Sequence, residues 1–221
     1  MFSIALTGGI ATGKSTFART FRELAPGTVF FDCDACVHAL MTEEDVKQEI
    51  VSAFGPVQAA DGSLDRSRLR ELVFDNAERR HTLEGILHPR VRAACMAAQE
   101  AAAAAQAEFF LADVPLLYES GFPVPRDLEV VVATTPEEQR QRLMARSRLT
   151  PEMVDRILAA QLPLSEKMRR AGVVIWNGGA PVWLSHQTAH LVAWLRRPVP
   201  ASAPAAAEGG HSCFSHEHGV C

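Results

Sequence analysis

Short apolar segments alternate along most of the chain with longer segments of helical periodicity. The apolar segments are residues 2–6, 28–31, 109–114, 128–133 and 173–176, and each has the length and composition of a buried strand. Helical patterns fill residues 14–24, most of 35–107, and the stretch after 180 that carries Leu184, Leu191, Val192 and Leu195. Strands that alternate with helices favour a parallel sheet covered on both faces. The pattern therefore predicts an α/β fold with a parallel five-stranded sheet flanked by helices.

Three helices have recognisable start signals. Asp65 precedes residues 66–74 and is a plausible cap, and Thr135-Pro136-Glu137-Glu138 places a threonine cap before a proline in the first turn. Thr150-Pro151-Glu152 repeats that signal. The alanine-rich residues 93–107 have strong helix propensity, so we predict a helix there as well.

The helical pattern ends near Arg197 and a different composition follows. Residues 198–210 are rich in Pro, Ala and Gly, and we expect the whole of 198–221 to be disordered beyond a single domain at 1–197. The tail holds zinc-type side chains at a spacing that matches no standard finger: His211, Cys213, His216, His218 and Cys221.

Composition narrows the functional class. The 221 residues suit one domain, and 48% of them are hydrophobic, which is enough for a substantial core. The net charge of -4 disfavours a role in binding nucleic acid, and no apolar run approaches the ~20 residues of a membrane span. The N-terminus lacks the pattern of a signal peptide, and five cysteines favour reduced thiols. We expect a cytoplasmic protein with no obligate protein partner.

A glycine-rich loop follows the first strand and opens the first helix. Residues 8–15 read Gly-Gly-Ile-Ala-Thr-Gly-Lys-Ser and fit the pattern G-x-x-x-x-G-K-[ST]. Backbone N–H groups of such a P-loop surround phosphate oxygens at the positive end of a helix. Lys14 would reach the β- and γ-phosphates of a nucleotide, and the Ser15 hydroxyl would bind Mg²⁺. The predicted nucleotide-binding residues here are Gly8, Gly9, Ala11, Thr12, Gly13, Lys14, Ser15 and Thr16.

Two carboxylates follow the second predicted strand. Asp32 and Asp34 occupy alternate positions, which share one face if the strand continues through them. Carboxylates at such a strand end can accept the proton of an attacking hydroxyl and hold Mg²⁺ through water. The guanine-specifying N-K-x-D and the D-x-x-G of switch GTPases are both absent from the sequence, so we favour a kinase.

Further short motifs occur in a fixed order along the chain. The loop is followed by Asp32-x-Asp34, then by Gly62-x-x-Asp65-Arg66-x-x-Leu69, Val73-Phe74, Leu83 with His88-Pro89, Pro115-Leu116-Leu117-x-Glu119, Gln139-x-x-Arg142-x-x-x-Arg146, Gln161 and Asn177-Gly178. Over residues 2–195 the chain resembles the dephospho-coenzyme A kinases. The resemblance implies that ATP, with Mg²⁺, phosphorylates the ribose 3′-hydroxyl of dephospho-coenzyme A. It also implies a helical substrate-binding region at about 35–107 and a lid at about 138–170.

The sequence departs from that family at two places. The family loop usually has glycine and serine where this chain has Ala11 and Thr12, and both are small enough for the loop to form. The family usually carries an acidic residue where this chain has Gly172, just before the fifth strand. We expect this difference to alter slightly the surroundings of the adenine of the nucleotide.

The resemblance assigns roles on the acceptor side of the site. Asp34 is the candidate catalytic base, and Asp32 supports Mg²⁺ or the loop and lies beside the substrate. His88-Pro89 is expected to open a helix, where His88 either caps the helix or contacts substrate. Pro115 and Leu116, together with Leu117, are expected to form a crevice wall.

Other candidates belong to the phosphate side. Arg142 and Arg146 are four residues apart, so they share a helix face, and arginine forks suit transferring phosphates. We predict Arg142 and Asn177 as nucleotide ligands and Arg146 as catalytic. Asp113 at a strand end resembles the acid of a Walker B motif, although a strand-end carboxylate also caps turns.

Other functions stay open from the residues alone. A shikimate-like or gluconate-like P-loop kinase would also have acidic residues after its second strand. The His/Cys tail suggests a P-loop metal-delivery protein, but such proteins generally use GTP. Cys33 and Cys36 form a C-x-x-C, which on its own suggests redox or zinc chemistry.

Overall fold

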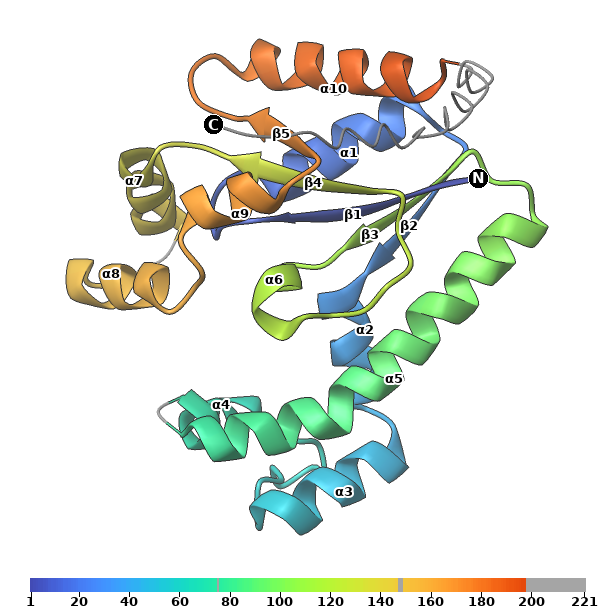
Figure 1. The fold of residues 1–221 in the computed structure, drawn as a ribbon. Coiled ribbons are helices and arrows are strands. Elements are labelled where there is room, and N and C mark those ends of the chain that lie inside the picture. Colours follow the sequence, from blue (N-terminus) through green and yellow to red (C-terminus); the bar gives the residue numbers. More distant parts are fainter. Residues whose placement is uncertain (75, 147–148, 198–221) are drawn as a thin grey trace, which may run out of the picture.

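The computed structural model describes residues 1–74, 76–146 and 149–197, and these form a three-layer α/β fold (Figure 1). Five strands make one sheet in the order β2-β3-β1-β4-β5, and every neighbouring pair is parallel. The strands are β1 (Phe2–Gly8), β2 (Thr28–Asp32), β3 (Phe109–Asp113), β4 (Leu128–Ala133) and β5 (Val173–Trp176). The predicted fold class is confirmed, and β1 lies at the centre of the sheet.

Helices cover both faces of the sheet. They are α1 (Lys14–Leu24), α2 (Cys33–Leu40), α3 (Glu44–Phe54), α4 (Arg66–Phe74), α5 (Ala77–Ala104), α6 (Leu117–Ser120), α7 (Pro136–Arg146), α8 (Pro151–Ala159), α9 (Leu164–Arg170) and α10 (Pro181–Leu195). Figure 1 shows α1 and α10 together on one face, while α2 to α5 extend from the other. Among the described residues, none of these helices combines the length and the apolarity that crossing a bilayer requires.

Two apolar cores hold the layers together. Phe17 and Phe21 of α1 pack with Leu184 and Leu191 of α10 on one face of the sheet. The second core joins the opposite face to the helical region, and it includes Val46, Ile50, Leu87, Val91 and Phe110. The central strands β1 and β3 and most of β4 are buried, which explains why their sequences are mostly apolar.

The predicted helix starts are confirmed by their caps. The Asp65 side chain accepts a hydrogen bond from the Arg68 backbone N–H at 3.0 Å. Thr135 Oγ1 accepts from the Glu138 N–H at 3.1 Å, at the start of α7. The side chain of Thr150 caps α8 in the same way. Each cap satisfies one of the free N–H groups of a first helical turn.

The predicted helix start at His88-Pro89 is wrong, because both residues lie inside α5. Proline removes one backbone donor and crowds the carbonyl four residues earlier, here that of Gly85. The guanidinium of Arg90 donates to the neighbouring Ile86 carbonyl at 2.8 Å. Packing of α5 against α2, α3 and α4 outweighs the local cost of the proline, and Figure 1 shows that the helix bends along its length.

The cysteines of the described chain have the properties of core thiols. Burial raises the pKa of Cys33 well above its ordinary value, raises that of Cys95 to about 11, and also raises that of Cys36. A raised thiol pKa lowers the thiolate population on which redox and metal chemistry depend, so the C-x-x-C hypothesis loses support. The predictions about the tail at 198–221 fall outside the described residues.

Candidate active site

The loop at residues 8–15 joins β1 to α1, as predicted, and its shape depends on glycine. Gly13 has a φ of 96°, in the left-handed region, and precedes the first residue of α1. A Cβ at Gly13 would meet the side-chain amide of Asn177, and the positive φ strains any residue other than glycine. The Gly13 carbonyl accepts from the N–H groups of Thr16 and Phe17, which begins the helix directly at the loop.

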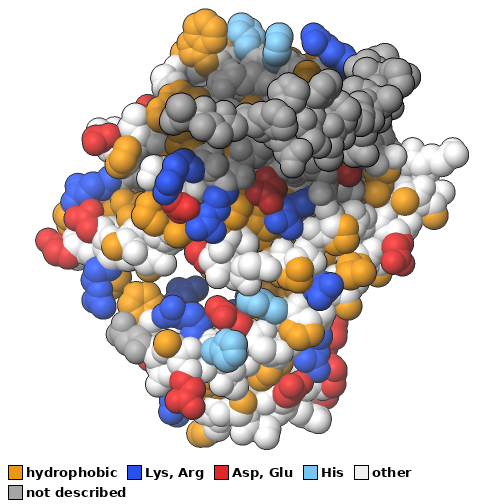
Figure 2. Space-filling model, in the orientation of Figure 1, with side chains coloured by type: hydrophobic (Ala, Val, Ile, Leu, Met, Phe, Trp, Pro, Cys, Tyr) orange, Lys and Arg blue, Asp and Glu red, His pale blue; other side chains and the backbone are white. Residues whose placement is uncertain are grey.

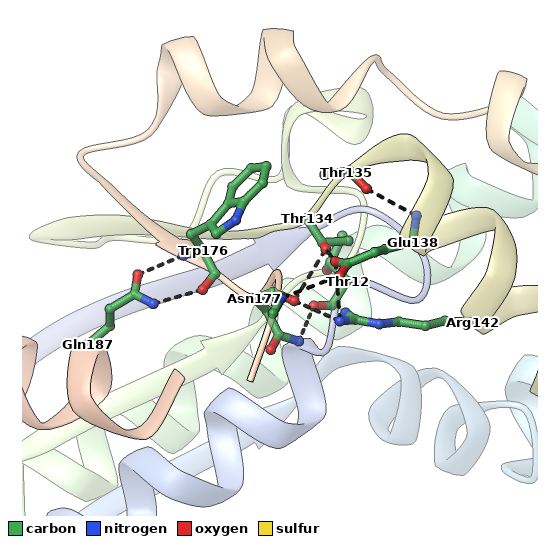
Figure 3. Close-up of polar contacts among 9 residues, drawn as sticks. Thr12, Thr134, Thr135, Glu138, Arg142, Trp176, Asn177 and Gln187 are labelled. Atoms are coloured by element: carbon green, nitrogen blue, oxygen red, sulfur yellow. Dashed lines mark hydrogen bonds and ion pairs between the residues drawn. The ribbon is translucent and has the colours of Figure 1, made fainter. Parts of the chain in front are cut away.

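Asn177 fixes the loop from the end of β5. Its Nδ2 donates to the Thr12 carbonyl at 2.7 Å, and its own carbonyl accepts from Nη2 of Arg142 at 2.7 Å (Figure 3). Arg142 also lies 3.3 Å from Oε2 of Glu138. Asn177 therefore contacts the loop directly, and Arg142 contacts Asn177.

Two glutamines hold the loop from the opposite side. Nε2 of Gln139 donates to the Ile10 carbonyl at 2.9 Å, and Oε1 of Gln161 accepts from the Ile10 N–H at 3.0 Å. Gly9 allows this approach, because a Cβ there would lie 2.4 Å from Nε2 of Gln139. Both glutamines belong to the sequence motifs, although the sequence assigned them no site role.

The two unusual loop residues fit the loop, as expected. Thr12 is fully buried, and its hydroxyl donates to the Gly9 carbonyl at 2.9 Å. Ala11 has a φ of 59°, a left-handed conformation that costs an alanine about 1–2 kcal/mol. The loop therefore forms with its backbone strained at Ala11, where a glycine would relax it.

An ion pair lies beneath the loop. Nζ of Lys14 is 2.5 Å from Oδ1 of Asp113, the last residue of β3. Burial raises the pKa of Asp113, while the Lys14 charge opposes that rise. Asp113 is aligned with Asp32 in the β2–β3 register, so two carboxylates meet at the carboxyl edge of the sheet. The position of Asp113 beside Lys14 favours the Walker-type interpretation over turn capping.

Asp32 and Asp34 do not share a strand face, because β2 ends at Asp32 and Asp34 lies in the first turn of α2. Oδ1 of Asp32 caps α2 by accepting from the Ala35 N–H at 3.0 Å. The prediction of an extended pair is therefore wrong. The cap replaces the extended geometry with a helical turn that directs Asp34 into a cavity.

That cavity has a volume of about 390 Å³ and lies between α2, α5 and the segment after β3. It brings four predicted residues together: Asp34, His88, Pro115 and Leu116. Figure 2 shows a hollow between the sheet and the helical region, with charged and histidine side chains around it. Leu117 is instead buried in the core, so it does not belong to the wall.

The wall of the cavity is connected to the nucleotide loop. The Thr7 hydroxyl, one residue before Gly8, donates to the Pro115 carbonyl at 3.1 Å. His88 lies edge-on to Phe122 with ring centroids 6.3 Å apart. Since His88 is inside a helix, its capping role is excluded, and its place on the cavity favours contact with substrate.

Comparison with known proteins identifies a family for this chain. The dephospho-CoA kinase family matches residues 2–181 of the chain. The dephospho-CoA kinase of Geobacillus kaustophilus is 41% identical over 179 residues, which are 80% of this chain and 88% of the relative. That of Anaeromyxobacter dehalogenans is 43% identical over 208 residues, which are 91% of this chain and 97% of the relative.

The chain belongs to the dephospho-CoA kinase family. Solved structures also resemble this chain. The dephospho-CoA kinase from Campylobacter jejuni has a TM-score of 0.58 at 25% identity, with 87% of this chain and 96% of that chain covered. The protein TT1252 from Thermus thermophilus has a TM-score of 0.74 at 34% identity, with 88% and 97% covered.

In this member of the dephospho-CoA kinase family, the two predicted lid arginines have different surroundings. Arg142 is half-buried beside Asn177, whereas Arg146 is exposed at the last residue of α7. A bidentate pair between Arg140 and Asp155, at 2.7 and 3.2 Å, joins α7 to α8. Arg142 therefore lies next to the residue that holds the loop, and the roles of both arginines stay predictions.

Magnesium is implied by the kinase family, and the residues present fit it. Ser15 begins α1 next to Lys14, and the carboxylates of Asp32 and Asp113 lie at the same sheet edge. The described residues contain no group of three or more His, Cys, Asp and Glu side chains suited to a metal. Mg²⁺ in such sites takes one or two protein oxygens and completes its shell with substrate phosphates and water.

Sequence reasoning missed a lysine of this site. Lys167 of α9 is fully buried, and its Nζ contacts Gly8 of the loop and Glu119 of the cavity. A lysine on a helix with charged neighbours, here Glu166, Arg169 and Arg170, is usually interpreted as solvent-exposed. The sequence offered one signal, which is that lysine is rare in this chain. It occurs only at positions 14, 47 and 167 among the 22 Lys and Arg residues.

Proposed function

We propose that this chain transfers the γ-phosphate of ATP to the ribose 3′-hydroxyl of dephospho-coenzyme A, giving coenzyme A and ADP. One observation supports this most directly. The cavity that contains Asp34 shares the Pro115 wall segment with the nucleotide loop, since Thr7 is hydrogen-bonded to Pro115. A donor phosphate on the loop and an acceptor hydroxyl in the cavity would therefore be neighbours.

On the donor side, the loop N–H groups and the N-terminus of α1 would bind the phosphates of ATP. Lys14 would exchange part of its contact with Asp113 for the β- and γ-phosphates, and Arg142 would add charge beside the nucleotide. Ser15 and Asp32 would hold Mg²⁺, which neutralises phosphate charge when bound. Arg146, one turn beyond Arg142, is proposed to reach the transferring phosphate.

On the acceptor side, Asp34 would orient the hydroxyl and accept its proton as the phosphate transfers. Arg80 and His88 line the same cavity and carry or can carry positive charge. They suit an anionic acceptor such as a nucleotide-like diphosphate. We place acceptor binding in residues 35–107 and the lid in 138–170. Composition supports action in the cytoplasm, with no nucleic acid or obligate partner protein.

The test is an assay that couples ADP formation to a spectrophotometric signal, with dephospho-coenzyme A, shikimate and gluconate offered separately. We expect turnover with dephospho-coenzyme A alone, and with ATP in preference to GTP. Turnover with shikimate or gluconate but not with dephospho-coenzyme A would reject the proposed acceptor. A strict requirement for GTP would reject the assignment of the nucleotide.

A further inference from the structure

Lys167 has an unusual environment for a lysine. It lies on α9 with none of its surface exposed to solvent. A buried ammonium is costly unless its donors are satisfied by oxygen atoms. Nζ of Lys167 meets three such oxygens: the Gly8 carbonyl at 3.2 Å, the Pro115 carbonyl at 3.5 Å and Oε1 of Glu119 at 2.7 Å.

The geometry suits lysine and excludes arginine. An ammonium has three donors around one nitrogen, so it can reach three separate oxygens that converge on a point. A guanidinium is a planar fork that matches paired oxygens of one group. Arginine outnumbers lysine severalfold in this chain, yet position 167 is a lysine.

The three oxygens belong to two different parts of the site. Gly8 ends β1 and begins the nucleotide loop, whereas Pro115 and Glu119 line the acceptor cavity. Oε1 of Glu119 also accepts from the Leu162 N–H at 3.1 Å. Gln161, which holds the loop at Ile10, is the residue just before Leu162.

We propose that Lys167 and Glu119 form a clamp that sets the distance between the nucleotide loop and the acceptor cavity, with Lys167 as a positioning residue for phosphoryl transfer. The proposal rests on the proposed function, because it concerns alignment of that donor with that acceptor. Lys167 touches neither substrate. Its ammonium fixes Gly8 and the Pro115–Glu119 segment to each other, so the γ-phosphate and the acceptor hydroxyl keep one separation.

The clamp should affect the chemical step more than ATP binding. The other braces of the loop, at Ile10 and Thr12, do not involve Lys167, so the loop keeps its shape without it. What changes is the position of the cavity wall relative to the loop. A displacement of about 1 Å between reacting groups lowers rates by as much as about 100-fold.

The experiment compares Lys167→Met, Glu119→Gln and the double variant Lys167→Met/Glu119→Gln with the wild-type chain. Methionine has nearly the length of lysine without its charge, and glutamine keeps an oxygen that can accept from Lys167. Measurements are kcat, both KM values, thermal stability, and the ratio of ADP formed to acceptor phosphorylated. Lys47→Met is the matched control, because Lys47 pairs with Glu44 on α3 and does not line the cavity that contains Asp34.

Lys167→Met is expected to lower kcat by about 10- to 100-fold, with KM for ATP changed by less than about threefold. Its ratio of ADP to phosphorylated acceptor should rise above one, because water replaces a misaligned hydroxyl. Glu119→Gln keeps an oxygen that accepts from Lys167, so it should lower kcat less than Lys167→Met does. The double variant leaves no carboxylate without its ammonium partner, so it should be more stable than Lys167→Met while kcat stays low.

A double variant that regains kcat together with stability would reduce Lys167 to a structural role and overturn the proposal. So would a kcat for Lys167→Met equal to that of the Lys47→Met control. If Lys167→Met does not fold, the double variant is compared with the wild-type chain instead. Failure of the wild-type chain to phosphorylate dephospho-coenzyme A overturns the proposed function instead, so the two failures are distinguishable.

Discussion

Replacing Lys14 by alanine perturbs two properties of this site at once. The substitution removes the cation that would bind the β- and γ-phosphates. It also leaves the Asp113 carboxylate without the ammonium that lies 2.5 Å from it. The side chains are 16% and 9% exposed, respectively, so this pair is mostly shielded from water.

The structure sets the size of both effects. Removing one partner of a buried ion pair costs about 3–5 kcal/mol. Because Lys14 is partly exposed and water can enter the space it leaves, we take the low end, about 3 kcal/mol. In a domain of this size each kcal/mol shifts Tm by about 2–4 °C, so Tm should fall by about 6–12 °C. Turnover should fall by at least about 10²- to 10³-fold, as for the loss of one transition-state donor.

The loss of stability should depend on pH. Burial raises the pKa of Asp113 and Lys14 opposes that rise, so the pKa goes higher when Lys14 is removed. Between the ordinary and the raised pKa, the folded variant binds a proton that the unfolded chain has released. Stability therefore falls as pH rises through that interval, and the deficit relative to wild type should be larger at about pH 8 than at about pH 5.

The assay is thermal unfolding of wild type and variant at several pH values, together with the coupled ADP assay. The control is Lys14→Ala/Asp113→Asn, which removes the unpaired charge and should regain most of the Tm without activity. A deficit that is independent of pH, or a double variant no more stable than the single one, would refute the argument about Asp113. Near-normal turnover of Lys14→Ala would refute the role of Lys14 on the phosphates.

Three further substitutions test single residues. Asp34→Asn should lower kcat by about 100-fold or more while ATP still binds in calorimetry, and a near-normal kcat would remove Asp34 as the base. Arg146→Lys should lose most activity because a planar fork is replaced by a point charge, and an unchanged kcat/KM would make Arg146 a solvated residue. Asn177→Ala removes the bond to Thr12, so KM for ATP should rise about tenfold in steady-state kinetics, and an unchanged KM would show that the loop holds its shape alone.

Much of the fold could be predicted because its signals are local. Each strand is a short, mostly apolar segment, and the threonines at 135 and 150 cap helices where the sequence placed them. Gly13 and Lys14 could be assigned because the loop motif requires only a strand before it and a helix after it, and the structure has both.

The errors occurred where tertiary contacts outweigh local preference. Pro89 is a typical helix-start residue, but packing of α5 on three other helices keeps it inside a helix. Asp34 lies two residues after the end of β2, and the cap supplied by Asp32 turns the backbone before Asp34 is reached. Lys167 gave no local signal, because its three partners lie about 50 to 160 positions away in the sequence.

The braces of the nucleotide loop also determine when the site is completed during synthesis. The loop emerges early, but its partners Gln139, Gln161 and Asn177 follow 129, 151 and 165 residues after the positions they hold. Contacts so distant in sequence form only after the intervening chain has closed, and a nascent chain that stops before β5 still lacks Asn177. A stalled or truncated chain would thus contain the loop motif but not the complete binding site for ATP. Acquisition of nucleotide affinity would mark the arrival of the last strand, which makes ATP a natural reporter for the final stage of folding.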